Sequence, residues 1–207
     1  YFSSFKKHPS TNDILKGKSM TKPKQLNTIA ILMPGDMGHG CALVFQQNGL
    51  RVVTCLAGRS QRTRNLAKKA GLEIMPSLSA LVKTADLVLS ILPPEYAIEQ
   101  AIHVAAAMKA VATYPDYVDC NAISPTTAKK VAATFVGLAA NFVDGGIIGL
   151  NPVKEAGMTR LYVSGGETTL VRQLNGQGMV VRDLGPEIGR ASAMKMVYAS
   201  STKGAFS

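Results

Sequence analysis

The chain alternates between short apolar runs and longer segments in which apolar and polar residues mix. The apolar runs predict strands over residues 28–32, 51–57, 71–75, 86–92, 117–120, 141–148, 160–164 and 179–184. Helices are predicted between them: one ends near Asn48, one near Ala70, and the others cover residues 78–84, 95–111, 125–138, 167–175 and 186 onward. Strands that alternate with helices at this spacing are typical of an α/β fold with a doubly wound, mostly parallel sheet. Ligands of such sheets bind beyond the carboxyl ends of the strands, where the strand order reverses.

The link between the first strand and the first helix is rich in glycine. Gly35 and Gly38 match the second and third glycines of the dinucleotide fingerprint G-x-G-x-x-G, and Met33 stands at the first. The second glycine lets phosphates approach the backbone, and the third lets the helix pack closely on the strand. The backbone of Gly35, Asp36, Met37 and Gly38 is therefore a candidate pyrophosphate site at a helix N-terminus. This interpretation predicts a Rossmann-type sheet; the alternative is an ordinary glycine-rich turn without a ligand.

The end of the second strand carries arginines where an acid is often found. An Asp or Glu about twenty residues past the loop usually binds the free 2′-hydroxyl of NAD. Here Arg59, Ser60 and Arg62 follow the strand instead. Guanidinium groups bind phosphate through two hydrogen bonds, and a serine hydroxyl can add another, so this pattern favours NADP over NAD. We assign Arg64 to the solvated face of the following helix.

The composition fits one sizeable globular domain. The chain has 207 residues, of which 46% are hydrophobic, which is enough to bury a core. Three cysteines, at positions 41, 55 and 120, have neither the spacing of a disulfide framework nor that of a zinc site. We therefore expect no metal and a reducing, cytoplasmic location. Glycine, proline or a charge interrupts each apolar run well short of a membrane span.

Much of the positive charge lies near the N-terminus. The net charge is +10, and residues 1–27 hold six lysines and one aspartate, a net charge of +5. We expect residues 1–26 to be a flexible basic extension and residues 27–185 to be the NADP-binding domain. The extension is similar to an organelle transit segment, although it lacks arginine, and Met20 would be a normal start for the domain. Charge alone does not indicate a nucleic-acid partner, and no motif or aromatic interleaving supports one.

The last predicted helix carries a lysine on an apolar face. The neighbours of Lys195 at helical spacing include Ala191, Met194 and Tyr198, with no acid among them. Such a lysine commonly extends its amine to water. The functional alternative is that burial lowers its pKa for acid–base chemistry.

These features resemble the β-hydroxyacid dehydrogenase group, which includes 6-phosphogluconate dehydrogenase, 3-hydroxyisobutyrate dehydrogenase and related imine-reducing enzymes. The resemblance spans residues 28–207. The group's G-x-G-x-M-G loop matches residues 33–38, and its arginine–hydroxyl step, which is associated with NADP, matches Arg59 and Ser60. Its leucine–proline turn beside the nicotinamide ribose matches Leu92 and Pro93.

The half of the pattern that concerns the substrate departs from the group. The strand end Asp-x-Ser-Thr-x-Ser-Pro matches residues 119–125 but has Asn121 and Ala122 in place of the Ser-Thr. The segment Asp-Ala-Pro-Val-Ser-Gly-Gly becomes residues 144–150, without the serine. The helix motif G-x-G-x-x-x-K-x-x-N ends on Tyr198 instead of asparagine. The sequence looks most like a phosphogluconate-dehydrogenase-like subgroup, and we do not assign phosphogluconate as the substrate.

The resemblance implies an NADP-dependent oxidoreductase that acts on a small hydroxy acid, oxo acid or imine. Lys195 would exchange a proton with the substrate, and Tyr198 and Asn121 would orient the substrate oxygen. Members of the group continue into an all-helical domain, so the resemblance implies that residues 186–207 begin this domain, which is largely missing from this sequence. We therefore expect the complete protein to be a homodimer and this chain alone to be inert, with Lys195 accessible. The alternatives are an NADP-binding sensor or pseudoenzyme and, on charge alone, a nucleic-acid binder.

Overall fold

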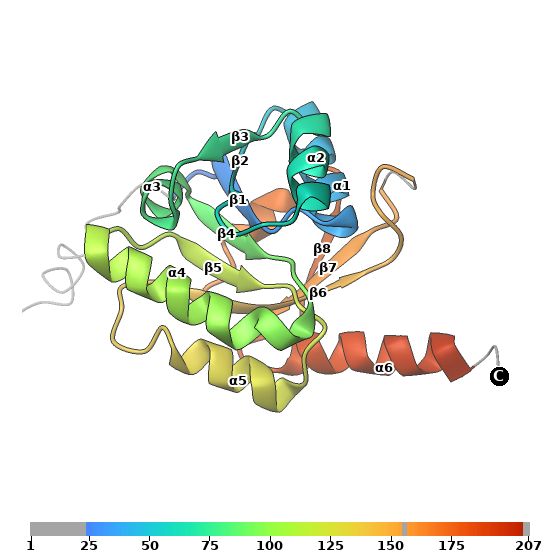
Figure 1. The fold of residues 1–207 in the computed structure, drawn as a ribbon. Helices are drawn as coiled ribbons and strands as arrows, with labels where there is room; N and C mark the ends of the chain where they lie inside the picture. The colour runs from blue at the N-terminus through green and yellow to red at the C-terminus, as the bar shows by residue number, and fades with distance from the viewer. Residues whose placement is uncertain (1–23, 155–156, 205–207) are drawn as a thin grey trace, which may run out of the picture.

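The computed structural model describes residues 24–154 and 157–204, which form an eight-stranded sheet with helices on both faces (Figure 1). The strands run in the order β3-β2-β1-β4-β5-β6-β7-β8. Among the strand pairs of the described residues, only β6–β7 is antiparallel, so the expected α/β, mostly parallel architecture is confirmed. The strand bounds are β1 (Thr28–Leu32), β2 (Arg51–Cys55), β3 (Glu73–Met75), β4 (Leu87–Ser90), β5 (Asp116–Asp119), β6 (Phe142–Ile148), β7 (Arg160–Ser164) and β8 (Val180–Asp183).

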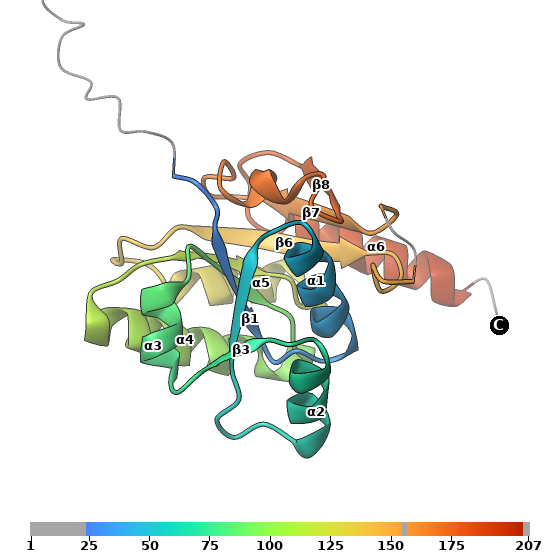
Figure 2. The same cartoon turned by 90° about the horizontal axis from the view of Figure 1, so that it is seen from above.

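Two groups of helices cover the sheet. The bounds are α1 (Asp36–Gln47), α2 (Gln61–Lys69), α3 (Leu78–Thr84), α4 (Ala97–Val111), α5 (Pro125–Ala133) and α6 (Arg190–Gly204), with short 3-10 turns η2 (Pro94–Tyr96) and η3 (Val171–Leu174). One hydrophobic cluster packs α1 and α2 on the sheet, and a second packs α3, α4 and α5 on the opposite face. Figure 2, seen from above, shows α6 projecting away from the body of the domain.

The strand order reverses between β1 and β4. The chain moves from β1 outward to β3 and then returns to the other side of β1 to form β4 and β5. The carboxyl ends of β1, β4 and β5 therefore lie next to one another and next to the start of α1. This is where an open α/β sheet binds its ligand.

Two predicted helices are shorter than expected. Only η3 is helical in the predicted segment 167–175, because Glu167 accepts hydrogen bonds from both the N–H and the hydroxyl of Thr169. Such local bonds compete with helix formation. The helix expected to run to residue 138 ends at Ala133, where the Thr134 hydroxyl donates to the Val131 carbonyl.

The packed chain reaches further toward the N-terminus than the predicted boundary at residue 26. Leu26 is 5% exposed and belongs to the core, and its N–H donates to Gln173. Lys24 bonds to Asp116 at 3.3 Å. The rest of the predicted extension, residues 1–23, lies outside the described residues. Within the described ranges, no helix is both long and apolar enough to span a membrane.

Candidate functional site

A cavity of about 460 Å³ opens at the point where the strand order reverses. It brings together most of the residues expected to bind a cofactor, from segments far apart in the sequence. Its walls include residues 35–38, Ser60, Arg62, residues 91–93, residues 120–122, Ile147 and Lys195. Arg59 and Tyr198 are not part of this wall.

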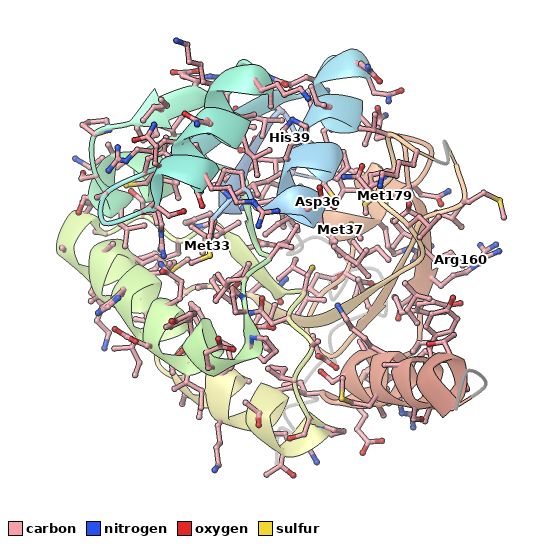
Figure 3. The ribbon with its side chains drawn as sticks, turned by 45° about the vertical axis from the view of Figure 1, so that its right-hand side comes forward. Met33, Asp36, Met37, His39, Arg160 and Met179 are labelled. Atoms are coloured by element: carbon pink, nitrogen blue, oxygen red, sulfur yellow. The ribbon has the colours of Figure 1, made fainter. Side chains whose placement is uncertain are left out.

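Met33 shapes the turn between β1 and α1 in place of a glycine. Its φ is +52°, in the left-handed region that glycine enters without strain. The turn is closed by a hydrogen bond of 2.6 Å from the Gly35 N–H to the Met33 carbonyl. Gly38 lies close to β1, since a Cβ there would be 3.2 Å from Ile31 Cγ2. Met33 therefore adopts a backbone conformation that suits glycine. In Figure 3, Asp36 and Met37 lie at the start of α1, and Met33 lies to their left.

The N-terminus of α1 has no side-chain cap. By contrast, α2, α3 and α5 are each capped by a serine: Ser60, Ser77 and Ser124. At α1 the cap residue is Gly35, which makes no such bond, and a Cβ there would meet nothing nearer than 3.9 Å. The first-turn N–H groups of a helix have no intrahelical acceptor and attract anions. This helix start therefore presents donors to open space at the cavity wall.

Arg59 lies in a second cavity of about 460 Å³, which shares Met33, Ser60 and Thr63 with the first. Its Nη2 donates to Gln100 Oε1 over 2.6 Å. Within the described chain, Arg59 Nε and Gln100 Nε2 are buried without a hydrogen-bond partner. Ser60 lines both cavities, but its Oγ already accepts the Thr63 N–H at the start of α2.

Asn121 links the ends of β4 and β5. Its Oδ1 accepts the Leu92 N–H at 2.7 Å, and its Nδ2 donates to Ser90 Oγ and Asp119 Oδ2, each at 3.0 Å. Both ends of the amide are thus engaged within the protein. The side chain fixes the turn that contains Leu92 and Pro93, and it has no N–H left to orient a substrate oxygen.

Asp119 lies beneath this turn and is fully buried. Burial raises the pKa of its carboxyl to about 7, with a smaller contribution from Asp144. Hydrogen bonds from Asn121 and the charge of Lys195 oppose that rise in pKa. The site therefore contains an acid that changes its protonation near neutral pH.

Lys195 lies at the cavity wall near the carboxyl end of β5. Its Nζ donates to the Cys120 carbonyl over 3.2 Å, and the side chain is partly buried. Burial lowers the pKa of the ammonium group, while the nearby Cys120 and Asp119 raise it. The expectation that Lys195 is simply accessible in this chain is wrong, because α6 packs close enough to β6 to bury its stem.

Gly146 permits this close packing. A Cβ on Gly146 would lie 2.8 Å from the Ala191 carbonyl oxygen and 3.2 Å from Lys195 Cβ. Any larger residue would move α6 away from the sheet, and Lys195 with it. The sequence pattern did not single out this glycine as part of the site.

Asp144 holds the start of α6 from beneath. Its buried carboxylate accepts the N–H groups of Gly189 and Ser192 and the hydroxyls of Ser164 and Ser192, at 2.5 to 3.1 Å. Sequence reasoning missed this role. The available signal was an acid inside an apolar strand, which needs donors to be buried.

Tyr198 lies one turn beyond Lys195 and points elsewhere. Its side chain is 47% exposed, and it lines neither cavity. Val197 beside it is 65% exposed. No cluster of His, Cys, Asp and Glu suited to a metal occurs in the part of the chain that the structure describes.

The fold and the site together define a Rossmann-type dinucleotide-binding domain, with an uncapped helix start at the switch point of a doubly wound sheet. Residues 28–175 match the family described as the NAD binding domain of 6-phosphogluconate dehydrogenase. The chain belongs to this family, which confirms the resemblance noted from the sequence.

Several relatives and solved structures are similar to the chain. An "uncharacterized 28.5 kDa protein in 7S RNA 5′ region" of Methanothermus fervidus is 31% identical over 159 residues, which cover 77% of this chain and 59% of that protein. A conserved protein of unknown function with structural similarity to 3-hydroxyacid dehydrogenases superposes with a TM-score of 0.74 at 29% identity, over 86% of this chain and 65% of that one.

A reductive aminase from Aspergillus terreus, solved with NADPH and ethyl levulinate, has a TM-score of 0.72 at 20% identity. The match covers 88% of this chain and 63% of the aminase chain. A 3-hydroxyisobutyrate dehydrogenase from Mycobacterium tuberculosis has a TM-score of 0.71 at 23% identity. The match covers 86% of this chain and 60% of the dehydrogenase chain. These two share the fold. The chain spans about three fifths of the length of the relatives it matches.

Proposed function

We propose that this chain binds NADP and that its protein is an oxidoreductase acting on a small hydroxy acid, oxo acid or imine. The observation that carries the proposal is one cavity with an uncapped helix start on one side and a partly buried lysine amine on the other. Membership of an NAD-binding family supports it. NADPH in the similar reductive aminase is consistent with the choice of cofactor.

The residues present fit a dinucleotide. The uncapped first turn of α1, with Asp36, Met37 and Gly38, would hold the pyrophosphate together with the close backbone approach at Gly35, because the first N–H groups of a helix have no intrahelical acceptor. Arg59, Ser60 and Arg62 would hold the adenosine end with its 2′-phosphate. The turn at Leu92 and Pro93, fixed by Asn121, would position the nicotinamide ribose. When bound, NADP supplies or accepts the hydride.

Lys195 would donate a proton to the substrate during reduction and accept one during oxidation. A lowered pKa makes the ammonium a better proton donor to a developing alkoxide or amine, and the free amine can take the proton back in the reverse direction. The Cys120 carbonyl, 3.2 Å away, orients the amine. The proposal gives no role to Tyr198, because its exposed side chain lines neither cavity in the described part of the chain.

The positions that anchor a substrate carboxylate in the family are altered here. Asn121 is engaged within the protein, and Ala122 has no polar side chain. We propose that substrate recognition comes from elsewhere in the protein. A cytoplasmic location, consistent with three buried free thiols, and a homodimer of the complete protein stay predictions.

The test is NADPH oxidation with a panel of 2- and 3-oxo acids and cyclic imines, using a protein extended over the full length of the relatives. Lys195→Met should lower kcat by about 10²–10⁴, the usual contribution of a positioned acid–base group. NADP affinity should stay within about twofold. Lys129→Met, an exposed lysine on α5, is the matched control and should leave kcat unchanged.

Two results would change the proposal. Near-normal turnover by Lys195→Met would assign the proton transfer to another group. Tight NADPH binding without turnover of any compound in the panel would favour the alternative of a sensor or pseudoenzyme.

A further inference from the structure

We propose that Gln100 is a positioning residue that fixes the guanidinium of Arg59 and thereby sets the preference for NADP over NAD. The inference rests on the proposed function, because it concerns the adenosine end of the same cofactor site. The two residues are 41 positions apart in the sequence and meet in the second cavity, between the end of β2 and the first turns of α4.

The first observation is the direction of the hydrogen bond. Arg59 Nη2 donates to Gln100 Oε1 over 2.6 Å. A guanidinium has five donors and no acceptor, so the glutamine must present its oxygen to it. One corner of the guanidinium is therefore held by an uncharged acceptor. Its full positive charge stays available to a ligand, as it would not beside a carboxylate.

The second observation is that this arrangement leaves hydrogen bonds unmade. Gln100 is 6% exposed, and within the described chain its Nε2 has no partner; the same is true of Arg59 Nε. A buried donor without an acceptor destabilises a protein, so packing alone favours an apolar side chain at this position. A buried glutamine that binds an arginine at a cavity wall therefore indicates a role in holding that arginine.

The third observation is the charge of the cavity. Arg59 is the one arginine or lysine among its lining residues, and Glu99 is the one carboxylate. Glu99 is exposed and lies beside Gln100 on the same helix. A 2′-phosphate has only acceptor oxygens and suits a fixed guanidinium, whereas the ribose hydroxyl of NAD suits a carboxylate. The orientation of Arg59 thus decides which of the two cofactors the cavity favours.

The experiment measures the affinity of the 207-residue chain for two probes, adenosine 2′,5′-bisphosphate and adenosine 5′-monophosphate, by calorimetry. The probes differ by the 2′-phosphate and lack the nicotinamide. Gln100→Leu should lower the affinity for the bisphosphate by about tenfold, because the charge-assisted contact from Arg59 is then misoriented. It should change the affinity for the monophosphate by less than about twofold. The melting temperature should change by less than about 3 °C, because a buried unpaired donor is also removed.

Three further variants test the charge of the side chain at position 100, the specificity of the effect and its dependence on Arg59. Gln100→Glu keeps an acceptor but places a carboxylate beside Arg59, which competes with the 2′-phosphate for the guanidinium. The affinity for the bisphosphate should therefore fall by about 100-fold. Gln47→Leu, an exposed glutamine on α1, is the matched control and should change neither affinity. In the Arg59→Ala background, Gln100→Leu should have no further effect on the ratio of the two affinities, because the glutamine acts through the arginine.

The outcomes distinguish this inference from the proposed function. Equal affinities of the unmodified chain for the two probes would refute the NADP preference itself. A strong preference that Arg59→Ala abolishes but Gln100→Leu leaves intact would overturn the role of Gln100 alone. A parallel loss of both affinities and of melting temperature in Gln100→Leu would show a purely structural role and would also overturn it.

Discussion

Asp144 is the residue whose removal should most directly displace Lys195. Its Oδ2 accepts three hydrogen bonds, from the Gly189 N–H, the Ser192 N–H and the Ser164 hydroxyl, and its Oδ1 accepts the Ser192 hydroxyl. A negative charge at this place also meets the positive end of the α6 dipole. Asp144→Ala removes all of these contacts at once.

The size of the expected destabilisation follows from the hydrogen-bond donors that lose their acceptor. After Asp144→Ala, the two hydroxyls can rotate toward other acceptors, but the two backbone N–H groups cannot. Each buried donor without a partner destabilises by about 1–3 kcal/mol, and the lost charge at the helix start adds up to about 2 kcal/mol. Two such donors and the lost charge together give an expected loss of about 2–8 kcal/mol in the free energy of unfolding.

Asp144→Asn should destabilise the fold much less than Asp144→Ala. An amide oxygen at the Oδ2 position can keep all three of its donors, and the amide N–H at the Oδ1 position can donate to the Ser192 hydroxyl. The main change is the loss of the negative charge, so we expect a loss of about 1–2 kcal/mol in the free energy of unfolding. Glu187→Gln is the matched control, since this acid lies close to the same helix start but is exposed, and it should change stability little.

Urea unfolding and amide hydrogen exchange together measure the effect. Urea gives the global free energy of unfolding, and exchange of peptides from residues 190–204 reports the local docking of α6. In Asp144→Ala the first turn of α6 should exchange faster than in Asp144→Asn. A loss below about 1 kcal/mol with unchanged exchange in Asp144→Ala would refute the reasoning, because the N–H groups would then have found other acceptors.

Two further predictions concern the acid and the turn next to the cofactor cavity. The carboxyl of Asp119 should titrate near pH 7 in a carbon-13 NMR measurement, and Lys195→Met should raise the midpoint, because the lysine charge lowers the pKa of Asp119. Since the folded chain keeps this proton to a higher pH than the unfolded chain, whose pKa is near 3.8, the contribution of Asp119 should lower the free energy of unfolding as the pH rises between these two values. A midpoint below about pH 5 would contradict the assignment. Met33→Gly should be more stable than Met33→Ala by about 1 kcal/mol in urea unfolding, because only glycine adopts the positive φ without strain; equal stabilities would show that the turn relaxes.

The architecture was largely readable from the sequence. Apolar runs of strand length and the glycine-rich link at residues 33–38 are local patterns, so they predicted a doubly wound sheet and its switch point. The antiparallel pair of β6 and β7 also had a signal: the link between them is short and contains no helical pattern, and a parallel connection requires a crossover. The predicted helix at residues 167–175 was mostly wrong because the Glu167 carboxylate accepts hydrogen bonds from the N–H and the hydroxyl of Thr169, and these bonds compete with the helix.

The sequence by itself determined the parts of the site that are built from adjacent residues: the loop with Gly35 and Gly38, the strand end with Arg59, and the lysine at position 195. Only the tertiary structure decided the contacts that hold them. Gln100 meets Arg59 across 41 positions, and Asp144 reaches Gly189 across 45. Local patterns arise from backbone geometry between near neighbours, whereas these pairs depend on how helices pack on the sheet, and packing is a property of the whole fold.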